Sequence, residues 1–300
     1  MDDFRDRRTA GAATGGTAGG RAEERLAELF SFLRRRITGD YEVDEFGFDP
    51  ELNEKVLLEA VRPLYRHWFR AKALGLGNVP ADSGVLVVAN HSGTLPVDAL
   101  MLQVAMHDEL GRSLRLLGAH LVYQLPVLGH LARKSGHTLA CPEDADRLLR
   151  KGEAVGVFPE GFKGIGKPFS ERYRLQRFGR GGFVASAIRA GVPIVPCAIV
   201  GAEEIYPKIG DLPSLARLLG LPYLPITPLF PWFGPLGMLP LPSKWLIEFG
   251  EPIRTDQYAP EEADDPMLVF DLSDHIRETM QRQLDALRLR RGPAFPPIAM

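Results

Sequence analysis

Residues 85–98 have the sequence VLVVANHSGTLPVD, in which five consecutive apolar residues are followed directly by polar side chains. A short, continuous apolar run of this kind is typical of a strand that is buried on both faces of a sheet. Comparable runs occur at 154–158, 192–200 and 245–249, and segments with helical spacing separate them. Strands that alternate with helices predict an α/β fold, with a largely parallel central sheet flanked by helices.

The flanking helices are predicted from apolar residues that recur every three or four positions. A further short strand is expected at 114–117. The helix predicted over residues 120–133 is expected to be interrupted at Pro126. The predicted helices cover residues 98–107, 120–133, 143–150, 181–190 and 266–290.

Two amphipathic helices are predicted ahead of the sheet, over residues 21–38 and 50–74. Asp49 is in position to cap the second helix, and Pro50 suits its first position. Three arginines at 34–36 crowd the end of the first helix. A basic amphipathic pair can lie on an anionic membrane, whereas packing on a protein core is the commoner arrangement. Both interpretations remain open at this stage.

Composition and pattern divide the chain into four parts. Residues 1–20 are rich in Ala, Gly and Thr and are predicted to be a disordered tail. The amphipathic helical pair occupies 21–74, and the α/β domain is predicted to occupy 75–255. Residues 256–300 hold the C-terminal helix and a tail.

The α/β domain contains an uncharged stretch at 218–243, which is long enough in principle to span a bilayer. Its seven prolines prevent a continuous helix, so we predict an ordered apolar loop. The aromatic residues Tyr223, Phe230, Trp232 and Phe233 either lie at a lipid interface or pack on the domain as a lid.

Charge and cysteine content exclude several classes of protein. The 300 residues include 36 Lys and Arg against 38 Asp and Glu, a net charge of -2, which argues against a nucleic-acid partner. Two cysteines exclude a disulfide scaffold and suit a reducing compartment. The N-terminal sequence MDDFRDRR is followed by no apolar segment, so no signal peptide is expected.

The polar residues after the first apolar run suggest a general base. His91 would lie at the end of a strand, and Asp98 would open the next helix. A carboxylate that accepts the Nδ1 proton of a histidine fixes its tautomer and leaves Nε2 free to take a proton from a hydroxyl group. A structural histidine with a helix-capping aspartate is the alternative interpretation of the same pair.

A second candidate region follows the run at 154–158. Basic residues crowd a glycine-rich segment that leads into the helix at 181–190, which favours binding of a phosphate group. A solvated basic loop is the alternative. The candidate substrate-binding residues are Glu160, Gly161, Lys163, Lys167, Arg177 and Arg180.

Residues 161–167 also match the pattern G-x-x-x-x-G-K of a nucleotide-binding P-loop. The next residue is Pro168, where the motif needs a Ser or Thr hydroxyl for magnesium, so a nucleotide site is the third-ranked interpretation. Neither G-x-S-x-G, H-E-x-x-H nor a paired C-x-x-C occurs in the sequence. We therefore expect no metal and no bound cofactor.

Three motifs in order resemble the blocks of the glycerolipid acyltransferases, especially the lysophosphatidic acid acyltransferase group. They are Asn90-His91 with Asp98, then Phe158-Pro159-Glu160-Gly161, then the sequence VPIVP at 192–196. The segment 248–253 is similar to the strand that closes that domain, and the resemblance covers about residues 75–255.

The resemblance implies a one-step transfer of a fatty acyl group from an acyl thioester to the free hydroxyl group of a lysophospholipid, with 1-acylglycerol 3-phosphate as the first candidate. Acyl-CoA or acyl carrier protein would be the co-substrate. His91 matches the family's base and Asp98 its partner, while Glu160 and Gly161 match the acceptor-side block. The resemblance also implies a peripheral protein on the cytoplasmic face of the cytoplasmic membrane.

The sequence departs from the family pattern in three places. Six residues separate His91 from Asp98 where the family usually has four, and Lys163 replaces a common arginine. The stretch 136–141 lacks the arginine of the family's second block, which favours a different or larger head group. Two alternatives therefore stay open: another lysolipid or a glycolipid as acceptor, and a non-catalytic lipid-binding homologue.

Overall fold

The computed structural model describes residues 18–92, 94–218 and 220–295, and the chain divides into two compact units, Met1–Val43 and Asp44–Met300. In the first unit, α1 (Ala18–Thr38) confirms the predicted N-terminal helix. It includes residues 18–20, which were predicted to belong to the disordered tail, and the rest of that tail lies outside the described residues. Most large apolar side chains of α1 are exposed, among them Phe30 at 67% and Ile37 at 85%, whereas Phe32 is buried.

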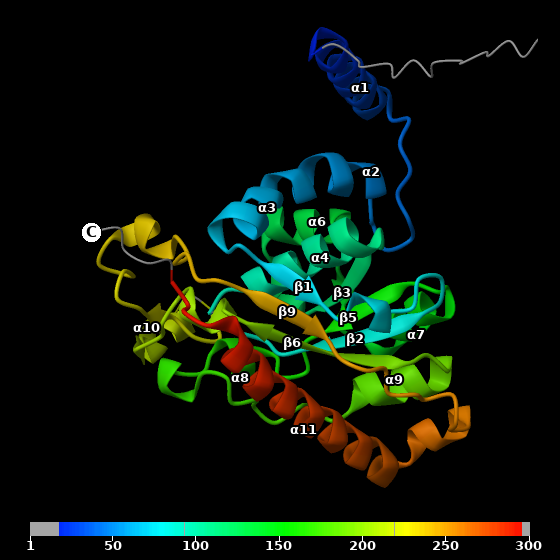
Figure 1. The fold of residues 1–300 in the computed structure, drawn as a ribbon, viewed down its shortest axis with the longest axis vertical. Coiled ribbons are helices and arrows are strands. Elements are labelled where there is room, and N and C mark those ends of the chain that lie inside the picture. Colours follow the sequence, from blue (N-terminus) through cyan, green and yellow to red (C-terminus); the bar gives the residue numbers. More distant parts are fainter. Residues whose placement is uncertain (1–17, 93, 219, 296–300) are drawn as a thin grey trace, which may run out of the picture. The chain divides into compact units, whose positions relative to one another are not determined.

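A seven-stranded sheet forms the centre of the second unit (Figure 1). Its order is β1-β9-β6-β2-β5-β3-β4, and every neighbouring pair is parallel except β6 and β9. The predicted α/β fold with a largely parallel sheet is thus confirmed. The strands are β1 (Lys72–Leu74), β2 (Val85–Ala89), β3 (Leu114–Gly118), β4 (Thr138–Leu139), β5 (Ala154–Val157), β6 (Ile194–Val200) and β9 (Leu246–Phe249). A separate two-stranded ribbon pairs β7 (Gly210–Asp211) with β8 (Pro225–Ile226).

The predicted helices are also present, with boundaries shifted by a few residues. The interruption expected at Pro126 separates α5 from α6. The helices of the second unit are α2 (Pro50–Leu52), α3 (Glu59–Pro63), α4 (Val97–Leu110), α5 (His120–Gln124), α6 (Pro126–Lys134), α7 (Pro142–Arg150), α8 (Phe162–Ile165), α9 (Gly182–Ala190), α10 (Pro213–Leu218) and α11 (Pro266–Arg291).

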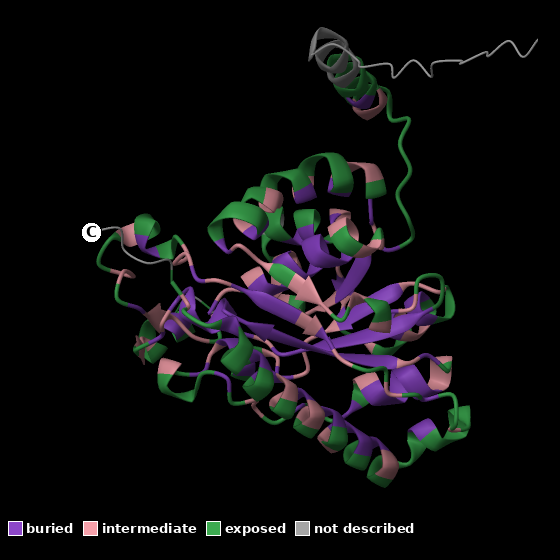
Figure 2. Cartoon of the chain, viewed as in Figure 1, coloured by how far each residue is buried: buried purple, intermediate pink, exposed green. Residues whose placement is uncertain are grey.

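Helices cover both faces of the sheet, and the side chains of β2 divide between the two cores. Val85, Val87 and Ala89 pack in the core that includes α4, while Leu86 and Val88 pack in the core that includes α7, α9 and α11. All five side chains are completely buried, and the central strands are buried along their length in Figure 2. Burial on both faces explains why this strand has a continuous apolar run instead of an alternating pattern.

The amphipathic helix predicted over residues 50–74 ends earlier than residue 74. The Asp49 side chain caps it by accepting a hydrogen bond from the Leu52 backbone, and helical structure, partly of π type, continues to Trp68. Phe69 then stacks on Trp245 with ring centroids 4.7 Å apart, and the chain enters the sheet as β1. The sheet therefore begins before residue 75, the predicted start of the α/β domain.

This second helix packs on the core and does not present a free apolar face. Leu58 and Tyr65 are buried in the α4 core, and Val61 and Leu64 pack against it. Of the two interpretations of the helical pair, core packing holds for this member.

The Pro-rich stretch 218–243 forms mostly loop, with a 3₁₀ turn at Gly234–Met238. Tyr223 packs on the domain and hydrogen-bonds the Thr94 carbonyl, whereas Trp232 and Phe233 are 73% and 62% exposed. The segment thus combines a packed part with an exposed apolar tip. Within the described residues, no helix combines the length and the apolar character needed to cross a membrane.

The C-terminal helix α11 contributes directly to the core, because Ile276 is completely buried against the sheet. We predict that Ile276→Ala lowers the free energy of unfolding by about 2–5 kcal/mol, through lost burial and the cavity it leaves. Met267→Ala, at a 67% exposed position of the same helix, is the control and is expected to change it by less than about 0.5 kcal/mol. Urea unfolding measures both. Equal effects of the two substitutions would show that α11 is not part of the core.

Candidate active site

Three adjacent parallel strands end at one edge of the sheet and bring the predicted motifs together. β2 lies between β5 and β6, and it is parallel to both. His91 follows β2, Glu160 follows β5, and Glu203 follows β6. Open α/β sheets bind their ligands beyond the carboxyl ends of their strands, so this edge is the candidate active site.

His91 and Asp98 form the predicted pair. The Nδ1 atom of His91 lies 2.9 Å from Oδ2 of Asp98, and the His91 side chain retains 13% exposure while Asp98 is completely buried. Asp98 lies in the first turn of α4, where the helix dipole favours a negative charge. Among the described residues, the Nε2 atom of His91 has no hydrogen-bond partner. This geometry presents Nε2 as the proton acceptor.

Asp98 is brought back to the histidine although six residues separate the two in the sequence, the last of which, Val97, begins α4. Asp98 Oδ2 also accepts a hydrogen bond of 2.8 Å from the Ser92 backbone, which closes the loop. Thr94 has a left-handed backbone with φ of 67°, and its hydroxyl group donates to the Tyr206 carbonyl over 3.2 Å. The longer spacing is therefore compatible with the His–Asp contact.

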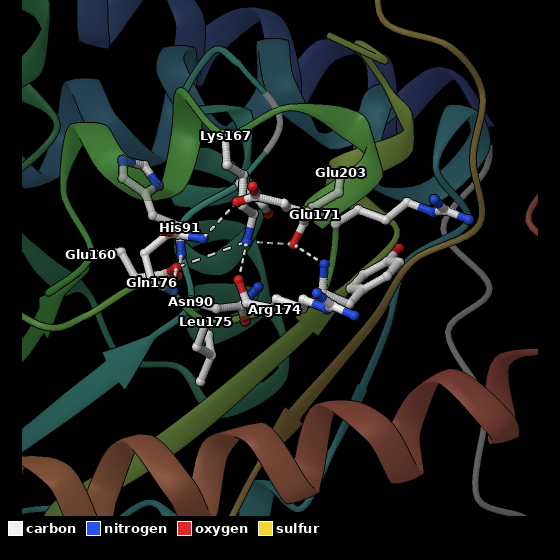
Figure 3. Close-up of polar contacts among 12 residues, drawn as sticks. Asn90, His91, Glu160, Lys167, Glu171, Arg174, Leu175, Gln176 and Glu203 are labelled. Atoms are coloured by element: carbon white, nitrogen blue, oxygen red, sulfur yellow. Dashed lines mark hydrogen bonds and ion pairs between the residues drawn. The ribbon is translucent and has the colours of Figure 1, made fainter. Parts of the chain in front are cut away.

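Glu160 lies beneath the histidine and joins two loops (Figure 3). Its Oε1 accepts from the His91 backbone over 2.9 Å, and its Oε2 accepts from the Gln176 backbone over 2.6 Å. Burial raises the pKa of Glu160, while Lys167 and the two backbone donors act in the opposite direction. Glu160 thus positions the backbone of His91, and both its carboxylate oxygens are occupied by the protein itself.

Lys167 is buried in a cluster with two carboxylates. Its Nζ lies 3.0 Å from Glu203 and 3.8 Å from Glu160, and it donates to the Arg174 carbonyl over 3.1 Å. The prediction placed Lys167 among the substrate ligands, but the structure places it beneath the site as the counterion of two glutamates. The same contacts pair Lys167, the lysine of the P-loop-like pattern, with carboxylates of the protein itself.

The remaining candidate basic residues lie on the surface. Lys163, Arg177 and Arg180 are exposed, and none of them forms an ion pair with a described residue. Arg177 lies over the ring of Phe270, 5.9 Å from its centroid. Their role as acceptor ligands stays a prediction.

Two glycines shape the turn that presents these residues. Gly161 has φ of 53° and ψ of −140°, a conformation that side-chain-bearing residues rarely adopt. At Gly164 an added Cβ would come within 2.7 Å of the His91 carbonyl oxygen. The chain therefore approaches the catalytic loop this closely only with glycine at 164.

Three contributions to the site were not predicted from the sequence. The Asn90 amide bonds both backbone groups of Ile199, at 3.0 and 2.7 Å, and so joins β2 to β6. The Gln176 backbone amide binds Glu160, and Glu203 pairs with Lys167. Glu203 could have been found from the sequence. It and Glu204 follow the apolar run at 192–200, just as His91 follows the run at 85–89. In the described residues, no three His, Cys, Asp or Glu side chains are grouped as a metal site.

Comparison with known proteins gives one family match and several relatives. The Acyltransferase family matches residues 70–200. An uncharacterized protein of Mycobacterium tuberculosis is 56% identical over 293 residues, which cover 96% of this chain and 82% of the relative. A 1-acyl-sn-glycerol-3-phosphate acyltransferase of Brassica napus is 27% identical over 47% of this chain and 40% of its own length.

A solved structure also resembles this chain. The 1-acyl-sn-glycerophosphate (LPA) acyltransferase PlsC from Thermotoga maritima aligns over 80% of this chain and 84% of its own, with a TM-score of 0.49 and 20% identity.

These matches define the chain as an acyltransferase by class. More narrowly, the match over residues 70–200 and the Brassica relative support membership of the glycerolipid acyltransferase family.

The buried glutamates give the free energy of unfolding a specific pH dependence. Desolvation raises the pKa of Glu203 to about 7, against the attraction of Lys167. Between about pH 4.5 and 7 the folded state therefore holds more protons than the unfolded state, and stability falls as pH rises, by up to about 3 kcal/mol. Glu203→Gln removes this titration, so its stability should decline less across the same window.

Urea unfolding at several pH values measures the effect, with Glu171→Gln as an exposed control that keeps the wild-type slope. An equal slope for wild type and Glu203→Gln would contradict the prediction.

Proposed function

We propose that this protein transfers a fatty acyl group from an acyl thioester, acyl-CoA or acyl carrier protein, to the free hydroxyl group of a lysophospholipid. The observation that carries the proposal is the His91–Asp98 contact of 2.9 Å, with Nε2 left without a partner among the described residues. The name of the Brassica relative supports 1-acylglycerol 3-phosphate as the first acceptor to test.

In the proposed reaction, His91 Nε2 takes the proton of the acceptor hydroxyl group while the oxygen attacks the thioester carbonyl carbon. Asp98 holds the Nδ1 proton and stabilises the imidazolium that forms. A new C–O bond then forms and the C–S bond breaks, and the departing sulfur takes the proton back from His91. The acyl group passes directly between substrates, with no covalent enzyme intermediate.

The acceptor side is assigned to the exposed basic residues. Lys163, Arg177 and Arg180 have no ion pair among the described residues and can approach a phosphate group. Glu160 and Lys167 act beneath them by holding the loops in place. Another lysolipid or a glycolipid acceptor would use the same chemistry with different contacts on this surface.

The test is thiol release from palmitoyl-CoA in the presence of lysophosphatidic acid. Removal of a general base costs about 10²–10⁴-fold in rate, so His91→Ala is expected to lose activity by at least about a hundredfold. His275→Ala, an exposed histidine on α11, is the control and should retain it. Thermal unfolding checks that His91→Ala remains folded.

The outcomes separate the alternatives. Release with another lysolipid or a glycolipid alone keeps the chemistry and changes the acceptor. Silence with every acceptor, with both CoA and carrier-protein donors, would refute the enzyme and favour a lipid-binding homologue.

We further propose that the protein acts peripherally, on the cytoplasmic face of the cytoplasmic membrane. The support is the surface of α1, where Leu29, Phe30 and Ile37 are exposed and three arginines lie at 34–36. Such a helix gains free energy from apolar insertion and from attraction to anionic lipid. The exposed tip formed by Trp232 and Phe233 offers a second apolar contact.

Phe30→Ser tests this location against Met267→Ser, because both side chains are 67% exposed. Loss of one inserted Phe is expected to weaken binding to anionic vesicles roughly tenfold. Sedimentation with vesicles measures it, and neutral vesicles should bind less of the wild type. If the two variants bind alike, α1 does not contact the membrane.

A further inference from the structure

A cavity lies beside the C-terminal helix, and no residue of the His91 loop lines it. It is open, has a volume of about 410 Å³, and lies between residues 172–173, Glu204 and the last turns of α11. This volume falls within the range of small-molecule sites. No residue assigned so far to the reaction lines it.

Three arginines line this cavity: Arg172, Arg288 and Arg291. Arg291 is buried and neutralised by Glu204, with nitrogen–oxygen distances of 2.5 and 2.7 Å. Arg288 has only a long contact of 3.7 Å to Asp285. Arg172 donates to the Phe169 carbonyl and pairs with no carboxylate among the described residues. Because Glu204 and Asp285 also line the cavity, its three arginines leave a net formal charge of +1.

The floor of the cavity is held in a strained backbone conformation. Tyr173 has φ of 63°, which is rare for a bulky residue. Its backbone N–H donates to Glu203 over 2.9 Å, and its carbonyl accepts from Gln281 over 2.9 Å. Arg288 lies 4.8 Å from the centroid of its ring. These contacts fix Tyr173 and with it the position of Arg172, its neighbour in the chain.

One donor in the wall of the cavity is unsatisfied. The Nε–H of buried Arg291 has no hydrogen-bond acceptor among the described residues, although both of its terminal nitrogens bind Glu204. A buried donor without a partner is costly and calls for an explanation.

We propose that this arginine-lined cavity binds a phosphate group of a substrate. The planar, forked guanidinium groups of Arg172 and Arg288 suit phosphate oxygens, and the volume leaves room for the organic group attached to them. Coenzyme A on the donor side and the head group of an anionic phospholipid are the two sources of such a phosphate. The inference rests on the proposed function only in naming these sources.

The cavity adjoins the network beneath the histidine through two adjacent glutamates. Glu203 pairs with Lys167, which also contacts Glu160, while Glu204 pairs with Arg291 in the cavity wall. Both glutamates follow β6 at the edge of the sheet that carries His91. A substrate bound through its phosphate in the cavity would therefore be held at the same edge as the proposed base.

The experiment measures binding by calorimetry in the His91→Ala background, where turnover does not interfere. The probes are coenzyme A, inorganic phosphate, and vesicles of phosphatidylcholine with and without phosphatidic acid. The test variant is Arg172→Ala with Arg288→Ala, and the control is Arg282→Ala, an exposed arginine of α11 outside the cavity. Arg172→Lys with Arg288→Lys keeps the charge and serves as a milder variant if the alanine pair unfolds.

We expect the alanine pair to weaken binding of at least one phosphate-bearing probe roughly tenfold or more, with the lysine pair intermediate and the control unchanged. Loss confined to coenzyme A identifies the donor, and loss confined to phosphatidic acid vesicles identifies the lipid. Equal binding by all variants to every probe would overturn the inference. If the protein with His91 releases thiol but the arginine variants bind every probe as well as the control does, the proposed function stands and the phosphate site is refuted. If binding depends on the two arginines but no thiol is released, the phosphate site stands and the proposed function is refuted.

Discussion

A single buried carboxylate holds the two halves of the active site together. Glu160 is 3% exposed, and its oxygens accept hydrogen bonds from the backbones of His91 and Gln176. A charged group is stable at such a position only when it is paired and hydrogen-bonded, which explains the buried Lys167 beside it. The position of the His91 loop after β2 therefore depends on residues that follow β5. The parallel arrangement of these two strands makes the contact possible.

The long spacing between His91 and Asp98 is accommodated by structure outside the motif. Thr94 is tied through its hydroxyl group and carbonyl to Tyr206 and Tyr223, which lie well beyond it in the chain. Tyr206 in turn donates to the Met238 carbonyl over 2.6 Å. The Pro-rich segment is thus packed against the catalytic loop, although its tip is exposed. This connection gives a physical reason for an ordered segment with so many prolines so close to the site.

The main strands and helices could be predicted because their burial is recorded in apolar periodicity. β1 was missed because none of its three residues is fully buried and because it pairs with the distant β9, a contact that the local sequence pattern does not predict. The antiparallel direction of β9 is equally non-local. The His91–Asp98 pair was predictable because the two residues are close in the chain. The burial of Lys167 was not predicted, because a run of basic residues in a sequence does not distinguish a buried counterion from an exposed side chain.

In the structure, ion pairs with carboxylates distinguish the buried basic residues from the exposed ones. Lys167 and Arg291 are buried and paired with consecutive glutamates after β6, so their positive charges stabilise the architecture. Exposed cations such as Lys163 have no such partner among the described residues. Because a buried ion pair broken on one side leaves a costly unpaired charge, substitution at Lys167 disturbs folding and activity together. Burial and pairing thus separate Lys163, Arg177 and Arg180, the proposed acceptor ligands, from the buried Lys167, although all four residues follow the same motif in the sequence.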